Sequence, residues 1–103
     1  MSYKRVVITR FGGPEVFQVV VEDKLPAPQK GQVRIKTLAT SACFTDTMIR
    51  KGIYYGVKKK PPFALGYDVV GMVDELGEGV TNLHIGQRVA ELTVTGAYSE
   101  YLC

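Results

Sequence analysis

The sequence of 103 residues has no tryptophan, one histidine and two cysteines. Cys43 and Cys103 supply neither a disulfide framework nor a paired Cys-x-x-Cys metal clamp, and we expect both thiols to be free in a reducing compartment. Catalytic zinc sites usually take three protein ligands from Cys, His and carboxylates. His84 lies in a connector and is expected to be a solvated loop histidine. The other candidate ligands lie at no recognised spacing: Asp46, Asp68 and Glu75.

Long hydrophobic runs are also missing. No segment approaches the ~20 apolar residues that a membrane helix needs. Residues 1–8 lack the apolar core and the small-residue cleavage site of a signal peptide. We therefore expect a cytoplasmic protein without a membrane partner.

The sequence also has no large excess of charge of either sign. It contains 13 Lys and Arg and 10 Asp and Glu, for a net charge of +3. Only residues 58–60 concentrate positive charge, as a lysine triplet that fits a solvated loop. A basic stripe that would indicate a nucleic-acid partner is absent. A hydrophobic content of 46% and a charged content of 22% are ordinary for a single globular domain.

What the sequence does contain is a series of short β-rich stretches between turn residues. Residues 33–39 alternate most clearly, with Val33 and Ile35 expected to face the core and Arg34 and Lys36 to face water. Strands are expected over residues 3–11, 16–22, 33–39, 69–76, 88–93 and 97–103. The first two should form a hairpin. Six or seven such strands predict an antiparallel barrel or sandwich.

One helix is expected, over residues 45–51. Thr45 or Asp46 can cap its start, and Gly52 suits the left-handed position that ends it. The chain then ends inside the last expected strand. Because a barrel closes only when every edge is paired, we expect the barrel to be incomplete without further chain, and the unpaired edge to favour a homo-oligomer.

Three local features leave the chemistry open. Residues 77–82 (GEGVTN) begin like a phosphate-binding loop, but the third glycine and the following helix are missing, so a β turn is expected. Cys43 precedes the expected helix, where a thiolate would be favoured, yet no histidine is near in sequence and a buried packing cysteine is the favoured interpretation. Tyr54 and Tyr55 either pack or donate a hydrogen bond at a cleft rim; the spacing does not separate the two.

Five segments together resemble a known family. Residues 66–71 (GYDVVG), 77–80 (GEGV) and 86–89 (GQRV) are similar, in order, to the pattern Gly-His-Glu-x-x-Gly, Gly-x-x-Val and Gly-Asp-x-Val of the medium-chain dehydrogenase/reductase superfamily. Residues 43–54 (CFTDTMIRKGIY) and 96–101 (GAYSEY) resemble its zinc-free quinone oxidoreductase branch.

The resemblance implies a mostly β fold, a GroES-like antiparallel β barrel with one or two short helices. Residues 1–103 would be the N-terminal part of the catalytic domain of an NAD(P)H-dependent oxidoreductase that reduces quinones or activated carbonyl or alkene substrates. A Rossmann cofactor domain is expected after Cys103, and this chain alone is expected to be inactive. The competing hypothesis is a stand-alone GroES-like binding or assembly module without catalysis.

The resemblance also assigns site residues. Cys43 matches the zinc-ligand cysteine of the superfamily, but Tyr67 stands where the superfamily has its zinc-ligand histidine. The loss of that histidine implies that no zinc is bound. Hydrogen-bond donors must then polarise the substrate oxygen, and Tyr54 and Thr45 are the implied catalytic residues. Substrate contacts are implied for Cys43, Tyr54 and Tyr67, and contacts with the NADP cofactor for Cys43, Phe44 and Thr45.

Overall fold

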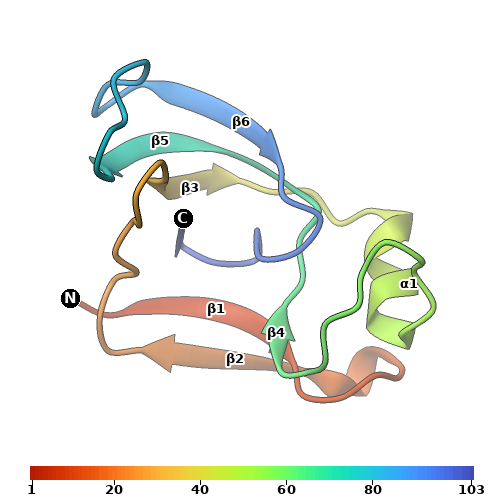
Figure 1. Cartoon of the computed structure of the whole chain (residues 1–103). Helices are drawn as coiled ribbons and strands as arrows, with labels where there is room; N and C mark the ends of the chain where they lie inside the picture. The colour runs from red at the N-terminus through yellow and green to blue at the C-terminus, as the bar shows by residue number, and fades with distance from the viewer.

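The computed structural model describes residues 1–103, which form two antiparallel sheets with one helix at one end of them (Figure 1). The elements are β1 Tyr3–Ile8, the 3-10 helix η1 Pro14–Val16, β2 Phe17–Glu22, β3 Val33–Ala39, α1 Phe44–Lys51, β4 Phe63–Ala64, β5 Asp68–Leu76, β6 Arg88–Leu92 and β7 Tyr101–Leu102. One sheet has the strand order β2-β1-β4 and the other β6-β5-β3-β7. The predicted mostly β, antiparallel fold is confirmed. No helix in it has the length and apolar character needed to cross a membrane.

The expected hairpin forms from β1 and β2, paired from Tyr3 opposite Glu22 to Ile8 opposite Phe17. Strand β1 ends at Ile8, three residues before the expected end at residue 11. The connection is a bend followed by η1, which has Pro14 at its first position. Proline suits this position because its fixed φ matches a helical start and its missing N–H would have no partner there.

The expected alternation of β3 holds for Ile35, which is buried, but not for Arg34. The Arg34 side chain is only 14% exposed, and its Nε and Nη1 atoms lie 2.7 Å from Asp74 Oδ2 and 2.9 Å from Glu75 Oε2. The prediction that Arg34 faces water is therefore wrong. A register shift between Arg34 and Ile35 interrupts the pairing with β5, and two carboxylates on β5 supply the partners that a partly buried guanidinium requires.

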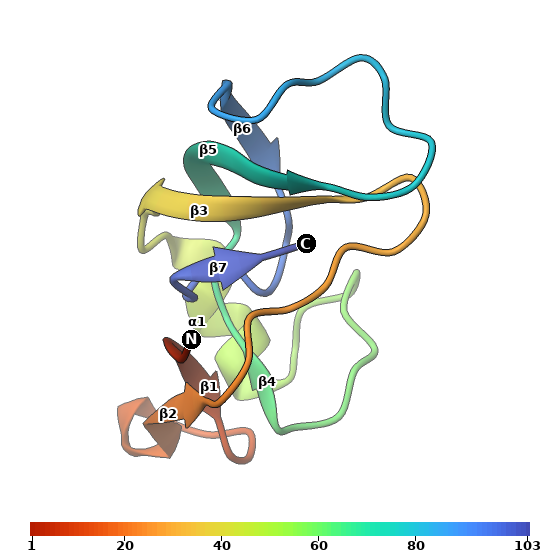
Figure 2. The ribbon, with the colours of Figure 1, turned by 90° about the vertical axis from the view of Figure 1, so that its left-hand side faces the viewer.

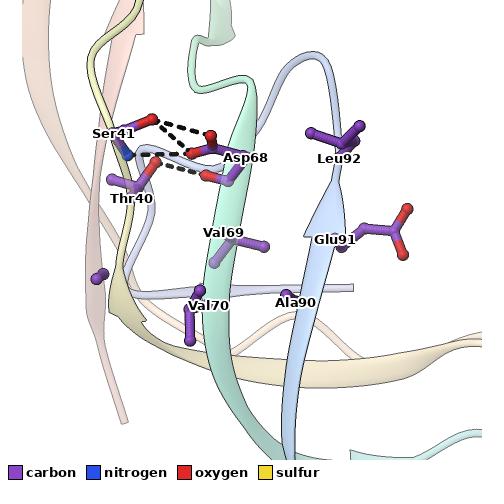
Figure 3. Close-up of a pocket in the computed structure, with 9 residues that line it drawn as sticks. Thr40, Ser41, Asp68, Val69, Val70, Ala90, Glu91 and Leu92 are labelled. Carbon is purple, nitrogen blue, oxygen red and sulfur yellow. Dashed lines mark hydrogen bonds between the residues drawn. The ribbon is translucent and has the colours of Figure 1, made fainter.

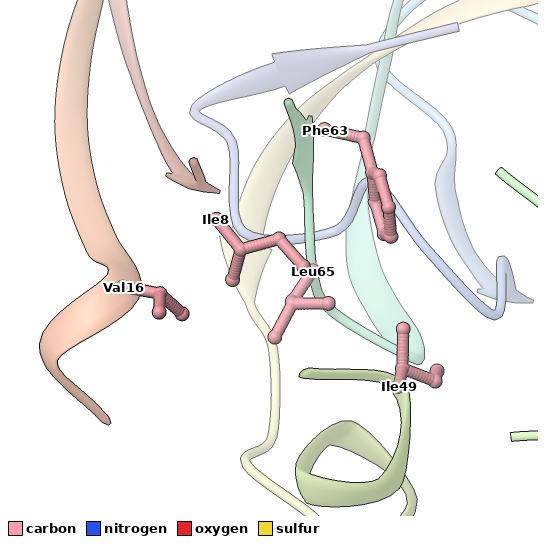
Figure 4. Close-up of a cluster of buried hydrophobic side chains, with 5 residues drawn as sticks. All are labelled: Ile8, Val16, Ile49, Phe63 and Leu65. Atoms are coloured by element: carbon pink, nitrogen blue, oxygen red, sulfur yellow. The ribbon is translucent and has the colours of Figure 1, made fainter. Parts of the chain in front are cut away.

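One cluster of buried hydrophobic side chains joins the first sheet to α1 (Figure 4). Its five buried side chains come from separate elements: Ile8, Val16, Ile49, Phe63 and Leu65. Three partly buried tyrosines, Tyr54, Tyr67 and Tyr98, pack against this cluster. Burial of the aliphatic and aromatic groups therefore also sets the positions of three phenols.

The two sheets do not close into a full barrel. Strand β7 lies beside β3 (Figure 2), but it covers only Tyr101–Leu102, whereas residues 97–103 were expected to be extended throughout. The first sheet meets this segment around the bridge between Arg5 and Ser99, where the Val6 N–H donates to the Tyr98 carbonyl and the Glu100 N–H donates to the Lys4 carbonyl. On the edge strand β2, Val19 and Val21 remain 61% and 59% exposed. The described residues thus form an open barrel, as expected.

The glycine-rich segment after β5 forms a turn, also as expected. The Val80 N–H donates to the Gly77 carbonyl at 3.3 Å, and Gly79 has a φ of +83°. The segment leads to β6 and not to a helix. It therefore lacks the helix N-terminus that would hold a phosphate group.

Candidate functional site

The N-terminus of α1 carries three of the predicted site residues. Cys43 is the N-cap residue and has extended backbone angles, so the expected cap at Thr45 or Asp46 is wrong. Asp46 contributes from inside the first turn instead, because its Oδ2 accepts the Cys43 N–H at 3.0 Å. Phe44 is 78% exposed, Thr45 is half-buried, and Gly52 ends the helix with a φ of +79°, as expected.

Cys43, Tyr54 and Tyr67 come together although they lie on three different segments. Tyr54 lies in the loop after α1, and Tyr67 immediately precedes β5. The side-chain hydrogen bond with Tyr54 raises the pKa of Tyr67, and the charge interactions with Tyr54 and Cys43 act in the same direction. Tyr54 and Tyr67 also pack against the same hydrophobic cluster, to which α1 contributes Ile49. The fold therefore brings the two tyrosines to the core beside the helix that Cys43 caps.

Asp46 and Tyr98 form a hydrogen-bonded pair at the N-terminus of α1, in which Asp46 is buried and Tyr98 is partly buried. Asp46 is 5% exposed, and its Oδ2 accepts the Tyr98 O–H at 2.8 Å, while its Oδ1 is inaccessible and has no hydrogen-bond partner. Burial, followed by this hydrogen bond, raises the pKa of Tyr98 well above its usual value. The phenol therefore stays protonated and remains a donor. Sequence reasoning missed this contact, because 52 residues separate the two partners.

A second polar link lies at the start of β5 (Figure 3). The Ser41 hydroxyl lies 2.9 Å from both carboxylate oxygens of Asp68, and the Ser41 N–H donates to Oδ1 at 3.1 Å. The Thr40 hydroxyl donates to the Asp68 carbonyl at 2.6 Å. These bonds tie the end of β3 to the residue that follows Tyr67. Alternation and turn signals along the chain could not identify this link, because it joins positions 27 residues apart.

An open groove of about 480 Å³ adjoins this link. Its apolar wall comes from β5 and β6, with Val69, Val70, Ala90 and Leu92 along it (Figure 3). The groove therefore places apolar surface beside the segment that carries Tyr67.

The candidate metal ligands do not converge. No three side chains of His, Cys, Asp or Glu are grouped so that they could hold a metal ion. His84 is exposed in its connector, where its N–H donates to Gln87 Oε1 at 3.0 Å. At the helix, Cys43 has Tyr67 as a neighbour where the zinc pattern would have an imidazole. The residues present therefore do not fit a zinc ion.

Because Asp46 accepts two hydrogen bonds, its variants should differ in how much they lower the free energy of unfolding. Asp46→Ala should lower the free energy of unfolding by about 2–3 kcal/mol, because it leaves the Cys43 N–H and the Tyr98 O–H without an acceptor. Asp46→Asn retains one carbonyl oxygen in this place and should cost less than half as much. Urea denaturation followed by circular dichroism measures both, and equal losses would contradict the acceptor role.

Comparison with known proteins shows the family to which the chain belongs. Residues 29–103 match the family described as the alcohol dehydrogenase GroES-like domain. The chain therefore belongs to this family, and its open barrel is a GroES-like one within the medium-chain dehydrogenase/reductase superfamily.

The relatives place it more narrowly, in the quinone oxidoreductase-like branch. The quinone oxidoreductase of Lama guanicoe is 37% identical over 99 residues, which cover 95% of this chain and 30% of that protein. The structure of human synaptic vesicle membrane protein VAT-1 homolog-like protein matches with a TM-score of 0.90 and 30% identity, over 99% of this chain and 32% of that one. The Escherichia coli quinone oxidoreductase complexed with NADPH matches with a TM-score of 0.86 and 33% identity, over 96% and 30%. The chain thus spans about a third of the length of these relatives.

Proposed function

We propose that this chain is the N-terminal catalytic part of a zinc-independent, NADPH-dependent oxidoreductase that reduces quinones or activated carbonyl or alkene substrates. The observation that carries the proposal is that Tyr54 and Tyr67 pack on the same hydrophobic cluster as α1, the helix whose N-cap residue is Cys43. Its context is a family in which a structural relative is a quinone oxidoreductase complexed with NADPH.

We propose a separate role for each of the site residues. NADPH, when bound, supplies the hydride. The exposed Phe44 ring and the half-buried Thr45, on the first turn of α1, are suited to pack against the nicotinamide together with Cys43. Tyr54 donates a hydrogen bond to the substrate oxygen, where negative charge develops as hydride arrives. Tyr67, which packs against the same hydrophobic cluster as Tyr54, contacts the substrate in this proposal.

The absence of zinc in the proposed mechanism follows from Tyr67. A phenol is neutral at neutral pH and is a poor substitute for an imidazole ligand. Polarisation of the substrate must then come from hydrogen-bond donors. Metal analysis of the purified full-length protein should find far less than one zinc per chain, and stoichiometric zinc would refute this part of the proposal.

Catalysis by this site is proposed to need a dinucleotide-binding domain, which the longer relatives have room for. The present chain alone should not oxidise NADPH in the presence of a quinone, whereas the polypeptide that carries both domains should. We further propose that the enzyme is a cytoplasmic homo-oligomer. A gene that encodes no dinucleotide-binding domain would favour the alternative of a binding module without catalysis.

A pair of adjacent tyrosines provides a controlled test of the catalytic donor. In the full-length enzyme, Tyr54→Phe should lower kcat/KM for quinone reduction by about 10- to 100-fold, because a hydrogen bond to the developing charge is lost. Tyr55→Phe is the matched control, since Tyr55 is 95% exposed, and should leave kcat/KM within about twofold. Stopped-flow measurement of NADPH oxidation reports both. Equal activity of the two variants would remove Tyr54 from the mechanism.

A further inference from the structure

The backbone of Tyr98 is fixed against the segment that leads into the candidate site. Its N–H donates to the Leu65 carbonyl at 2.8 Å, and its carbonyl accepts the Val6 N–H at 2.8 Å. Its nitrogen lies so close to Gly66 that a Cβ added there would be 2.5 Å away. Because Gly66 directly precedes Tyr67, the backbone of Tyr98 lies against the segment that carries that phenol.

The hydroxyl end of Tyr98 reaches the other half of the site. It donates to Asp46 Oδ2 at 2.8 Å, and the same oxygen accepts the N–H of Cys43 at 3.0 Å. The second oxygen of this buried carboxylate has no partner. Loss of the Tyr98 hydroxyl would therefore leave a single donor for a carboxylate that is 5% exposed. A buried carboxylate with so few donors favours opening of the turn that contains it.

We propose that Tyr98 is a positioning residue, which acts through Asp46 to hold the Cys43 end of α1 in place relative to Tyr67. This inference rests on the proposed function, because it concerns the same site. Tyr98 spans the two segments that carry the site, and α1 is only 8 residues long. So short a helix is unstable without tertiary contacts, and we therefore expect its first turn to depend on the hydrogen bond between Tyr98 and Asp46.

The reactivity of the Cys43 thiol tests the proposal in this chain, with Cys103→Ser as the background. Tyr98→Phe keeps the ring and removes the hydroxyl, and should raise the rate of Cys43 modification by iodoacetamide about three- to tenfold as the first turn opens more often. Tyr101→Phe is the matched control. Tyr101 is a buried tyrosine on β7 that packs against Tyr3, with ring centroids 6.1 Å apart, and the Cys43 rate should not change.

A further variant separates positioning from a general loss of stability. If Tyr98 acts through Asp46, Tyr98→Phe should add no further increase in an Asp46→Asn background, whereas independent effects would multiply. If Asp46→Asn does not fold, hydrogen exchange of the Cys43 amide decides, and it should accelerate in Tyr98→Phe but not in Tyr101→Phe.

An unchanged Cys43 rate in Tyr98→Phe, an equal rise in Tyr101→Phe, or multiplicative effects with Asp46→Asn would overturn the proposal. The measurements need neither cofactor nor substrate. Their failure would therefore leave the NADPH oxidation test of the proposed function unaffected, and failure of that test would leave the positioning role intact.

Discussion

Gly66→Ala is expected to destabilise the chain by about 3–5 kcal/mol, a large part of the roughly 5–15 kcal/mol that holds a typical domain together. Gly66 has a φ of +115°, which residues with a Cβ rarely adopt. The added Cβ would also lie 2.5 Å from the nitrogen of Tyr98 and 2.8 Å from the carbonyl carbon of Ala97. Both contacts involve backbone, so no side-chain rotation can relieve them.

Gly79→Ala separates the cost of a side chain at positive φ from the cost of the steric contacts of the added Cβ. Gly79 has a φ of +83°, but a Cβ there would meet nothing within 4 Å. Its substitution should cost only about 1–2 kcal/mol, the backbone contribution alone. Urea denaturation of both variants measures the difference, which is the steric contribution at Gly66. Equal costs at the two positions would show that the close approach of Tyr98 to Gly66 is not present in solution.

Leu65→Ala is expected to cost about 3 kcal/mol, within the range seen when a fully buried leucine is truncated. Leu65 is 0% exposed and lies at the centre of the cluster that joins β1, β4, η1 and α1 (Figure 4). The cavity would form where β1, β4, η1 and α1 meet. Because Tyr54 and Tyr67 pack on it, the variant should also loosen the candidate site.

Leu92→Ala makes the same chemical change on the surface. Leu92 is 65% exposed on the edge strand β6, so its truncation should change the free energy of unfolding by less than about 0.5 kcal/mol. Thermal unfolding followed by circular dichroism compares the two leucines. A cost below about 1 kcal/mol for Leu65→Ala would contradict the core described above.

Local patterns predicted the elements of the fold well where a period or a turn residue was clear. The β1–β2 hairpin, the short helix that stops at Gly52 and the turn after β5 all follow from interactions between near neighbours in sequence. Arg34 shows where such patterns fail. The bulge beside it and the acidic partners on β5 belong to the pairing of two strands, and alternation within one strand contains no information about either.

For the candidate site, too, part could be predicted from the sequence and part could not. The identities of Cys43, Tyr54 and Tyr67 could be singled out from the sequence, through their place in the family pattern and the helix start. Their proximity could not, because it depends on how α1, the loop after it and the segment before β5 pack on one core.

The sequence by itself determined a mostly β, antiparallel domain with one short helix, and a tyrosine at position 67 where the superfamily pattern it resembles has histidine. Glycines, alternation and capping residues act over a few positions, so they leave a signal in the linear order. The tertiary structure alone decided that Tyr98 reaches Asp46 and that Ser41 holds Asp68. These contacts arise only when the packed sheets bring distant segments within hydrogen-bonding distance. Burial, as at Asp46, raises the free-energy cost of losing such a contact.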